Sequence, residues 1–173
     1  MKKPNAILTC GVGLAAVLAS GGACSTLQNT GSTARQEMVE QSKAFEKQGD
    51  YDKAVSYLAE AGEYRKASRL AEREKLYSTA AHWAEWAGQE YTAKRLYKEG
   101  LEVYEKTGDY GNAARCANGL GQIEKAILYY EKAGEYSVAG HLAEEEGMFE
   151  ESERLYKKSR ESKKPNKVEY RLK

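Results

Sequence analysis

Besides its 26 carboxylates, this 173-residue chain has two histidines and three cysteines whose types could support acid–base, metal or thiol chemistry. His82 and His141 each begin a His-x-Ala-Glu tetrapeptide, and this spacing is not a zinc-binding signature. The chain has no Gly-x-Ser-x-Gly, no His-Glu-x-x-His and no phosphate-binding loop. The sequence therefore predicts that the protein is not an enzyme and that it holds no metal and no cofactor.

The start of the chain has the pattern of a secretory signal peptide. Lys2 and Lys3 precede a mostly apolar run over residues 6–19, and small residues then lead to Cys24. This order of positive, apolar and small residues is typical of an export signal, which we predict over residues 1–23. The apolar run of about 14 residues is shorter than the roughly 20 that a transmembrane helix needs.

The stretch Gly21-Gly22-Ala23-Cys24 resembles the lipobox of bacterial lipoproteins, although the family usually has an aliphatic residue where Gly21 stands. The resemblance implies lipidation of Cys24, and Ser25 after the cysteine implies the outer membrane. The alternative is ordinary cleavage, which leaves Cys24 free to pair with Cys116 or with another molecule. The polar segment that follows predicts a flexible linker over residues 24–35, with a reach of about 18 Å that keeps the domain near its membrane.

The rest of the chain repeats a short motif of Gly, an acidic or amide residue and an aromatic or apolar residue. Its third members stand mostly 13 residues apart: Tyr51, Tyr64, Tyr77, Tyr91, Tyr110, Ile123, Tyr136 and Phe149. Apolar or small residues follow at offsets 3, 6, 7 and 10, which form one stripe of an α-helix. Fixed periods are typical of repeat architectures. We therefore predict an all-α, right-handed solenoid of about nine short antiparallel helices with a 13-residue half-repeat.

One step in this series, from Tyr91 to Tyr110, is longer than the others. It predicts a single longer helix over residues 90–107, in which Leu101 and Tyr104 continue the apolar stripe. In this alignment Tyr91 opens its unit, and Lys94 stands where the other units have a small residue. The small residue at offset 3 predicts close helix contacts, with the aromatic residue at offset 0 packed beside it.

The motif Gly-Asp-Tyr-x-x-Ala, with apolar residues seven and ten after the tyrosine, resembles the second helix of a tetratricopeptide (TPR) repeat. Tyr51, Ala54, Leu58 and Ala61 match that pattern, and the resemblance covers about residues 38–158. The usual 34-residue period and the closing proline are missing. The resemblance implies a TPR-like repeat domain, placed here over residues 36–160, and the role of a solenoid that holds protein partners.

The charges are unevenly distributed along the chain. Residues 25–156 hold 17 basic and 24 acidic residues, a sum of −7, whereas residues 157–173 hold eight basic and two acidic residues, a sum of +6. The net charge of +1 argues against a generic nucleic-acid binder. Since Pro165 ends any helix there, residues 161–173 are expected to form a basic tail. The tail is either a solvated terminus or an arm for anionic headgroups or an acidic partner.

Offset 5 of each unit points away from the core stripe, and on alternate helices it holds Ser56, His82, Arg115 and His141. This polar, partly basic row is a candidate partner-binding row, and an ordinary solvated row is the alternative. We therefore expect a non-enzymatic protein–protein interaction scaffold that is tethered to the bacterial cell envelope through Cys24 and binds envelope proteins, not nucleic acid. A module that binds cell-wall glycan or a small ligand is the alternative, and it predicts aromatic residues exposed in a groove.

Overall fold

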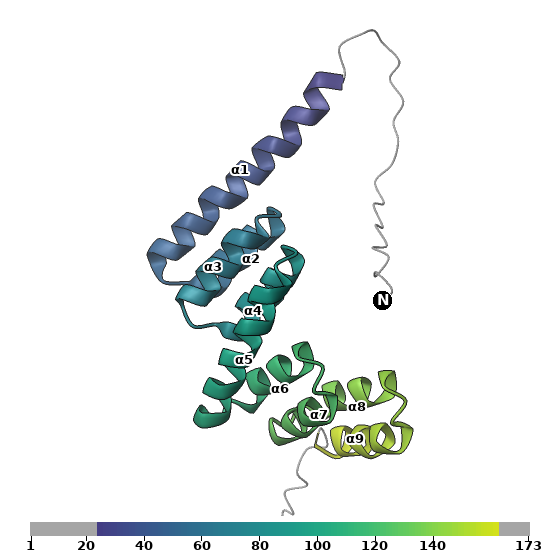
Figure 1. The fold of residues 1–173 in the computed structure, drawn as a ribbon. Helices are drawn as coiled ribbons and strands as arrows, with labels where there is room; N and C mark the ends of the chain where they lie inside the picture. Colours follow the sequence, from purple (N-terminus) through teal and green to yellow (C-terminus); the bar gives the residue numbers. More distant parts are fainter. Residues whose placement is uncertain (1–23, 163–173) are drawn as a thin grey trace, which may run out of the picture.

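The structure, a computed structural model, describes residues 24–162, and this part of the chain consists of helices without any strand (Figure 1). The helices are α1 (Cys24–Gln48), α2 (Tyr51–Glu60), α3 (Tyr64–Arg73), α4 (Tyr77–Trp86), α5 (Glu90–Thr107), α6 (Tyr110–Gly119), α7 (Ile123–Lys132), α8 (Tyr136–Glu145) and α9 (Phe149–Ser162). Each helix packs against the next one along the chain. The prediction of an all-α solenoid of short repeats is confirmed, and its right-handed sense stays a prediction.

The short connections between helices follow from the glycine of each motif. Gly62, with φ +74°, takes the left-handed conformation that residues with a Cβ rarely adopt. The chain then turns so that the Glu63 N–H donates to the Leu58 carbonyl at 2.8 Å, which satisfies an end group of α2. Asp50 caps the start of α2, because its side chain accepts from the Lys53 N–H at 3.3 Å.

The core is built from the alanines at offset 3, which are all at most 1% exposed. They are Ala54, Ala67, Ala80, Ala93, Ala113, Ala126 and Ala139. Their burial confirms that neighbouring helices approach closely at these positions. Larger side chains at offsets 6 and 7, such as Leu96 and Tyr130, complete the packing on either side.

The alignment of the fourth unit was wrong by one residue. Tyr91 is 85% exposed, whereas Ala93 is 1% exposed and Leu96 is fully buried. The unit therefore begins at Glu90, 13 residues after Tyr77, and the extra residues lie at the end of α5. The buried positions set the register of the helix, and an aromatic residue at offset 0 is not required. The longer helix over residues 90–107 is confirmed.

Residues 24–35, for which the sequence predicts a flexible linker, are helical in the structure, because α1 begins at Cys24. The segment has no proline, and Ala34, Arg35 and Gln36 favour helix formation. Extending a helix that is already anchored at Val39 and Phe45 is much easier than nucleating a new one. The predicted signal peptide over residues 1–23 lies outside the described residues. Of the predicted basic tail over residues 161–173, the first two residues end α9 and the rest lie outside the described residues.

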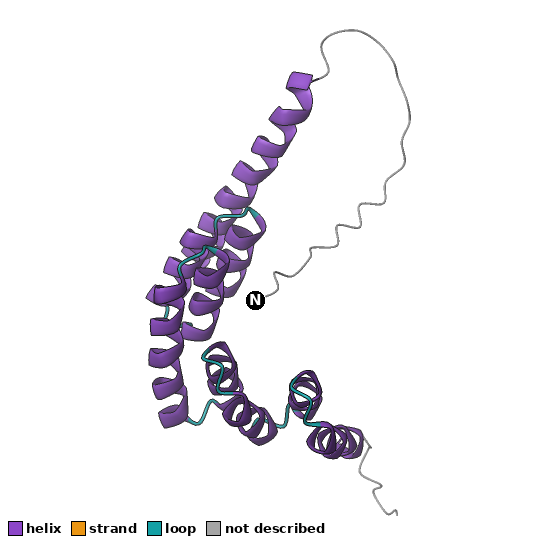
Figure 2. Ribbon diagram, turned by 45° about the vertical axis from the view of Figure 1, so that its right-hand side comes forward, coloured by secondary structure: helices purple, strands orange, loops and turns teal. Residues whose placement is uncertain are grey.

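The stack changes direction between α5 and α6. In Figure 2 the helices of the first half of the stack run upright, whereas those of the second half are seen nearly end-on. Gly100 of α5 lies where three helices meet, since a Cβ there would stand 2.6 Å from Tyr77 Cβ and 2.9 Å from Cys116 Sγ. This close approach lets α4 contact α6 directly as well as α5. Among the described residues, no helix combines the length and the hydropathy that crossing a bilayer requires.

Candidate functional site

The structure brings three of the four row residues together. Ser56 of α2, His82 of α4, Arg115 of α6 and His141 of α8 are all exposed. Ser56 and His82 line one pocket, and His82 and Arg115 line the neighbouring one. His141 lines neither of these pockets, and its Nδ1 lies 2.9 Å from the hydroxyl of Tyr156. The face on which α2, α4 and α6 carry these residues is called the even-helix face.

The first pocket lies at α2, α3 and α4, has a volume of about 380 Å³ and is called the tryptophan pocket. The residues that line it include Ser56, Glu60, Tyr64, His82, Trp83 and Trp86. The rings of Tyr64 and Trp83 stack with their centroids 5.8 Å apart, and Trp86 lies 5.7 Å from Tyr64. The imidazole of His82 meets Trp83 edge-on at 4.8 Å. The rings therefore hold one another in place.

Two residues of the tryptophan pocket remain open to a ligand. Trp86 is 60% exposed, although it is a large apolar side chain. Glu60 is exposed, and in the part of the chain that the structure describes it has no ion pair and no side-chain hydrogen bond. An exposed indole beside a free carboxylate is a surface that can bind, because the fold leaves most of the indole exposed and the carboxylate without a partner.

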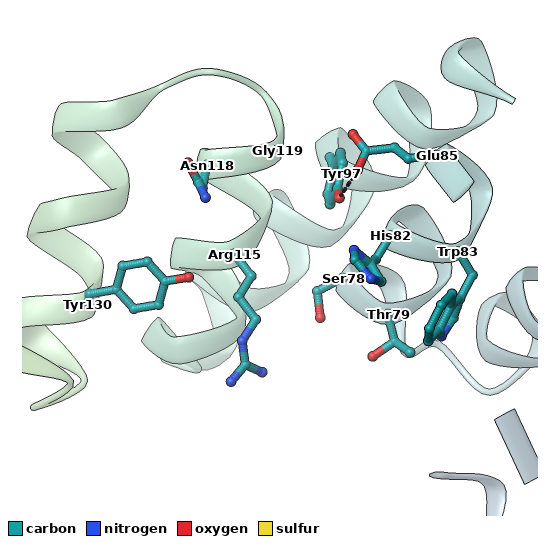
Figure 3. A pocket seen from close by; sticks show the side chains of 10 residues that line it. All are labelled: Ser78, Thr79, His82, Trp83, Glu85, Tyr97, Arg115, Asn118, Gly119 and Tyr130. Carbon is teal, nitrogen blue, oxygen red and sulfur yellow. Dashed lines mark hydrogen bonds between the residues drawn. The ribbon is translucent and has the colours of Figure 1, made fainter. Parts of the chain in front are cut away.

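The second pocket lies between α4, α5, α6 and α7, has a volume of about 410 Å³ and is called the arginine pocket (Figure 3). Tyr97 forms part of its wall, and its hydroxyl donates to Glu85 Oε2 at 3.1 Å. Gly119 makes room for this ring, since a Cβ there would stand 2.4 Å from Tyr97 atoms. In Figure 3, Arg115 extends from α6 between Tyr130 on one side and the side chains of α4 on the other.

The two charged side chains of the arginine pocket, Glu85 and Arg115, have different hydrogen-bond partners. Burial, and then the nearby Glu85 carboxylate, raise the pKa of Tyr97, so its hydroxyl stays protonated and keeps Glu85 engaged. The Arg115 guanidinium donates to the Asn112 side-chain oxygen at 3.2 Å. Within the described residues it has no carboxylate partner. The positive charge of Arg115 is thus available to an anionic group.

Neither pocket carries a catalytic arrangement that we can identify. Cys116 is fully buried, and burial raises the pKa of its thiol to about 12, so this thiol is inert at neutral pH. For the same reason Cys116 cannot pair with Cys24 or with another molecule without local unfolding. Among the side chains that the structure describes, residues 33–162, no three or more His, Cys, Asp or Glu are placed so that they could hold a metal ion. The arrangement is suited to binding.

Sequence reasoning missed the two most telling residues of the tryptophan pocket. Glu60 and Trp86 both stand at offset 9 of their helices, one turn after Ser56 and His82 at offset 5. Extending the row by four residues on each helix would have found them. Tyr64 was assigned to the core alone, although its ring also lines the pocket.

The comparisons with known proteins agree with this architecture. No curated protein matches the chain. A family model described as the GEMI5 TPR domain matches residues 29–167, which include most of α1 and all of α2 to α9. The match is wider than the resemblance over residues 38–158 that the motif itself carries. A TPR-type repeat domain is the architecture of a protein-interaction scaffold. The chain therefore belongs to the GEMI5 TPR domain family of helical repeats.

Proposed function

We propose that this protein is a non-enzymatic scaffold that holds partner proteins at the bacterial cell envelope. The observation that carries the proposal is the pair of neighbouring pockets on the even-helix face, which share His82 and Trp83. TPR-like domains bind protein partners, and an extended partner segment that crosses α2, α4 and α6 meets both pockets in turn. Exposed aromatic and arginine side chains are enriched where binding energy concentrates in interfaces.

In this proposal a lipid on Cys24 anchors the protein, and Ser25 favours the outer membrane. The signal-like run before Cys24 supports the anchor. Cys24 opens α1, and this helix packs on the repeats from about Val39 onward. Its first 15 residues, about 22 Å long, therefore form a stiff spacer between the lipid and the repeats. The pockets are then held away from the lipid surface, where a second envelope protein can reach them.

The test of the scaffold is co-purification from membranes after crosslinking. Wild-type protein is compared with Trp86→Ala, and with Tyr91→Ala as a control that removes an exposed aromatic residue outside both pockets. We expect the same partner bands with wild type and Tyr91→Ala, and their loss with Trp86→Ala. Identical bands for all three proteins would contradict binding at this face.

The anchor has its own test. Metabolic labelling with an acyl-chain analogue should label wild-type protein, and Cys24→Ser should abolish the label and release the protein from membranes. An unlabelled wild type that still folds and is exported would remove the anchor from the proposal. The scaffold role would stand, because it rests on the two pockets.

A second candidate function is the binding of cell-wall glycan or a small ligand. It is favoured by one observation, the 60% exposure of Trp86 beside Tyr64 and Trp83, because such a ring can stack on the apolar face of a sugar. Soluble cell-wall fragments that quench the tryptophan fluorescence and compete with the protein partner would favour this function over the scaffold.

A further inference from the structure

We infer that the tryptophan pocket receives a basic side chain, an arginine or lysine, from an extended segment of the partner protein. The inference rests on the proposed scaffold function and names the chemistry of what that scaffold holds. It concerns the α2–α4 part of the even-helix face, where Glu60 and Trp86 lie in one pocket.

The two exposed groups of this pocket, Glu60 and Trp86, are complementary to a cation. Glu60 supplies a carboxylate that has no partner among the described residues. Trp86 supplies an exposed indole, and tryptophan offers the best ring face for a cation. The stacked rings of Tyr64 and Trp83 form the wall behind them, so the site does not need to be assembled when the ligand arrives. An apolar ligand would leave the carboxylate of Glu60 without a partner.

The charged side chains Glu60 and Arg115 of the even-helix face have no ion-pair partner in the described residues and differ in sign between its two pockets. The tryptophan pocket has Glu60 free at α2, whereas the arginine pocket has Arg115 free of carboxylates at α6. Glu85 lies in the arginine pocket too and keeps its negative charge, but the Tyr97 hydroxyl donates to one of its oxygens at 3.1 Å and orients this carboxylate toward Tyr97. A bound segment therefore places a basic side chain near α2 and an acidic side chain near α6. This polarity fixes the direction in which the segment runs.

The tryptophans of this pocket can report ligand binding through their fluorescence. The chain has two tryptophans, Trp83 and Trp86, and both line this pocket. Trp86 lines the tryptophan pocket but not the arginine pocket, whereas Trp83 lines both. A change in tryptophan fluorescence on binding therefore reports on this part of the even-helix face, and the Glu60 variants assign it to the tryptophan pocket.

The experiment is a fluorescence titration of the full chain with synthetic peptides. The probes are acetylated and amidated octapeptides of alanine and glycine that carry one Arg and one Asp, separated by one to four residues. Matched peptides replace Arg by citrulline, which keeps its shape without its charge, or by Glu. We expect one spacing to bind best, and its citrulline version to bind at least about tenfold more weakly.

Three variants locate the effect. Glu60→Gln should weaken binding of the best peptide about fivefold. Glu60→Arg should reverse the preference, so that the Glu peptide binds better than the Arg peptide. Glu124→Arg makes the same charge change on the exposed surface of α7, outside both pockets, and should leave the dissociation constant within about twofold. Since Glu60 is exposed and unpaired, its variants should fold normally, which circular dichroism checks.

Three outcomes would overturn the inference: equal binding of the Arg and citrulline peptides, an unchanged preference in Glu60→Arg, or no fluorescence response to any peptide. None of these outcomes removes the scaffold itself. The scaffold fails only if Trp86→Ala retains every crosslinked partner band. The two failures can therefore be told apart.

Discussion

Tyr64 and Trp83 lie on different helices, α3 and α4, and their rings stack with an angle of only 5° between their planes. Both side chains are half-buried, so the pair belongs to the core and to the tryptophan pocket at once. The pocket is thus supported by the same contact that joins two consecutive helices. Its shape is set by the fold before any ligand binds.

This relationship predicts different effects for the two tryptophans. Trp83→Ala removes half of the stacked pair and should lower the free energy of unfolding by about 2 kcal/mol. Trp86→Ala removes a ring that is 60% exposed and meets Tyr64 only at a tilt, so it should lower the free energy of unfolding by no more than about 1 kcal/mol. Chemical denaturation followed by circular dichroism measures both. Equal losses would mean that Trp86 supports the core and not a binding surface.

The buried alanines predict a second contrast. Ala126 is fully buried at a helix contact, so Ala126→Leu should overpack it and lower the free energy of unfolding by about 1 to 3 kcal/mol. Glu124→Leu places the same side chain two residues earlier, on the exposed surface of α7, and should change it by less than about 0.5 kcal/mol. A thermal melt of each variant is sufficient. Similar melting temperatures would contradict the helical register described here.

Lys75 predicts a stabilising change. It has φ 61° at the turn between α3 and α4, where the corresponding turns have glycine. Lys75→Gly should relieve this left-handed strain and raise the free energy of unfolding by about 0.5 to 1 kcal/mol. The reverse change, Gly62→Ala at φ +74°, should lower it by about 1 kcal/mol. A lower melting temperature for Lys75→Gly would show that its side chain contributes more than the backbone strain costs.

An ion network between α7 and α9 predicts a dependence of stability on pH. Arg154 donates to both carboxylate oxygens of Glu131 at 2.8 Å, and Lys158 pairs with the same carboxylate. These hydrogen bonds, from Arg154 first and Lys158 second, lower the pKa of Glu131 to about 2. A carboxyl group whose pKa falls on folding stabilises the protein above its unfolded pKa of about 4.3, and this contribution is lost as the pH falls toward 2.

Glu131→Gln should therefore lower the free energy of unfolding at pH 7 by about 1 kcal/mol, a modest value because both basic partners are partly exposed. The difference from wild type should shrink between about pH 4.5 and pH 2. Urea unfolding across this range measures it, with Glu124→Gln as the control. A difference that stays constant with pH would exclude the ion network as its cause.

The sequence predicts the helices well because their signal is local and periodic. Glycine after each of these helices except α3, where Lys75 takes its place, and alanine three residues after each motif mark α2 to α4 and α6 to α8 without reference to distant contacts. The alignment fails at Tyr91 because an aromatic residue beside a motif looks like a core residue until the burial of Ala93 and Leu96 sets the register.

The pockets could not be predicted in the same way. Glu60, Tyr64 and Trp86 come from three different helices, and their meeting depends on how α2, α3 and α4 pack. An exposed tryptophan also carries no periodic signal, since it stands outside the stripe that defines the core. The sequence alone shows that His82 and Trp86 lie one turn apart on the same helix. It does not show that Glu60 and Tyr64, from two other helices, line the same pocket.

The central claim, that the even-helix face holds a protein partner, is tested most directly by site-specific photocrosslinking in membranes. A photoreactive benzoylphenylalanine is placed at Asn118, which lines the arginine pocket, and separately at Tyr91, which is 85% exposed on α5 and lines neither pocket. The account predicts a discrete crosslinked partner from position 118, its loss when Trp86→Ala is added, and none from position 91. Equal crosslinking from both positions, or a crosslink from position 91 alone, would contradict it.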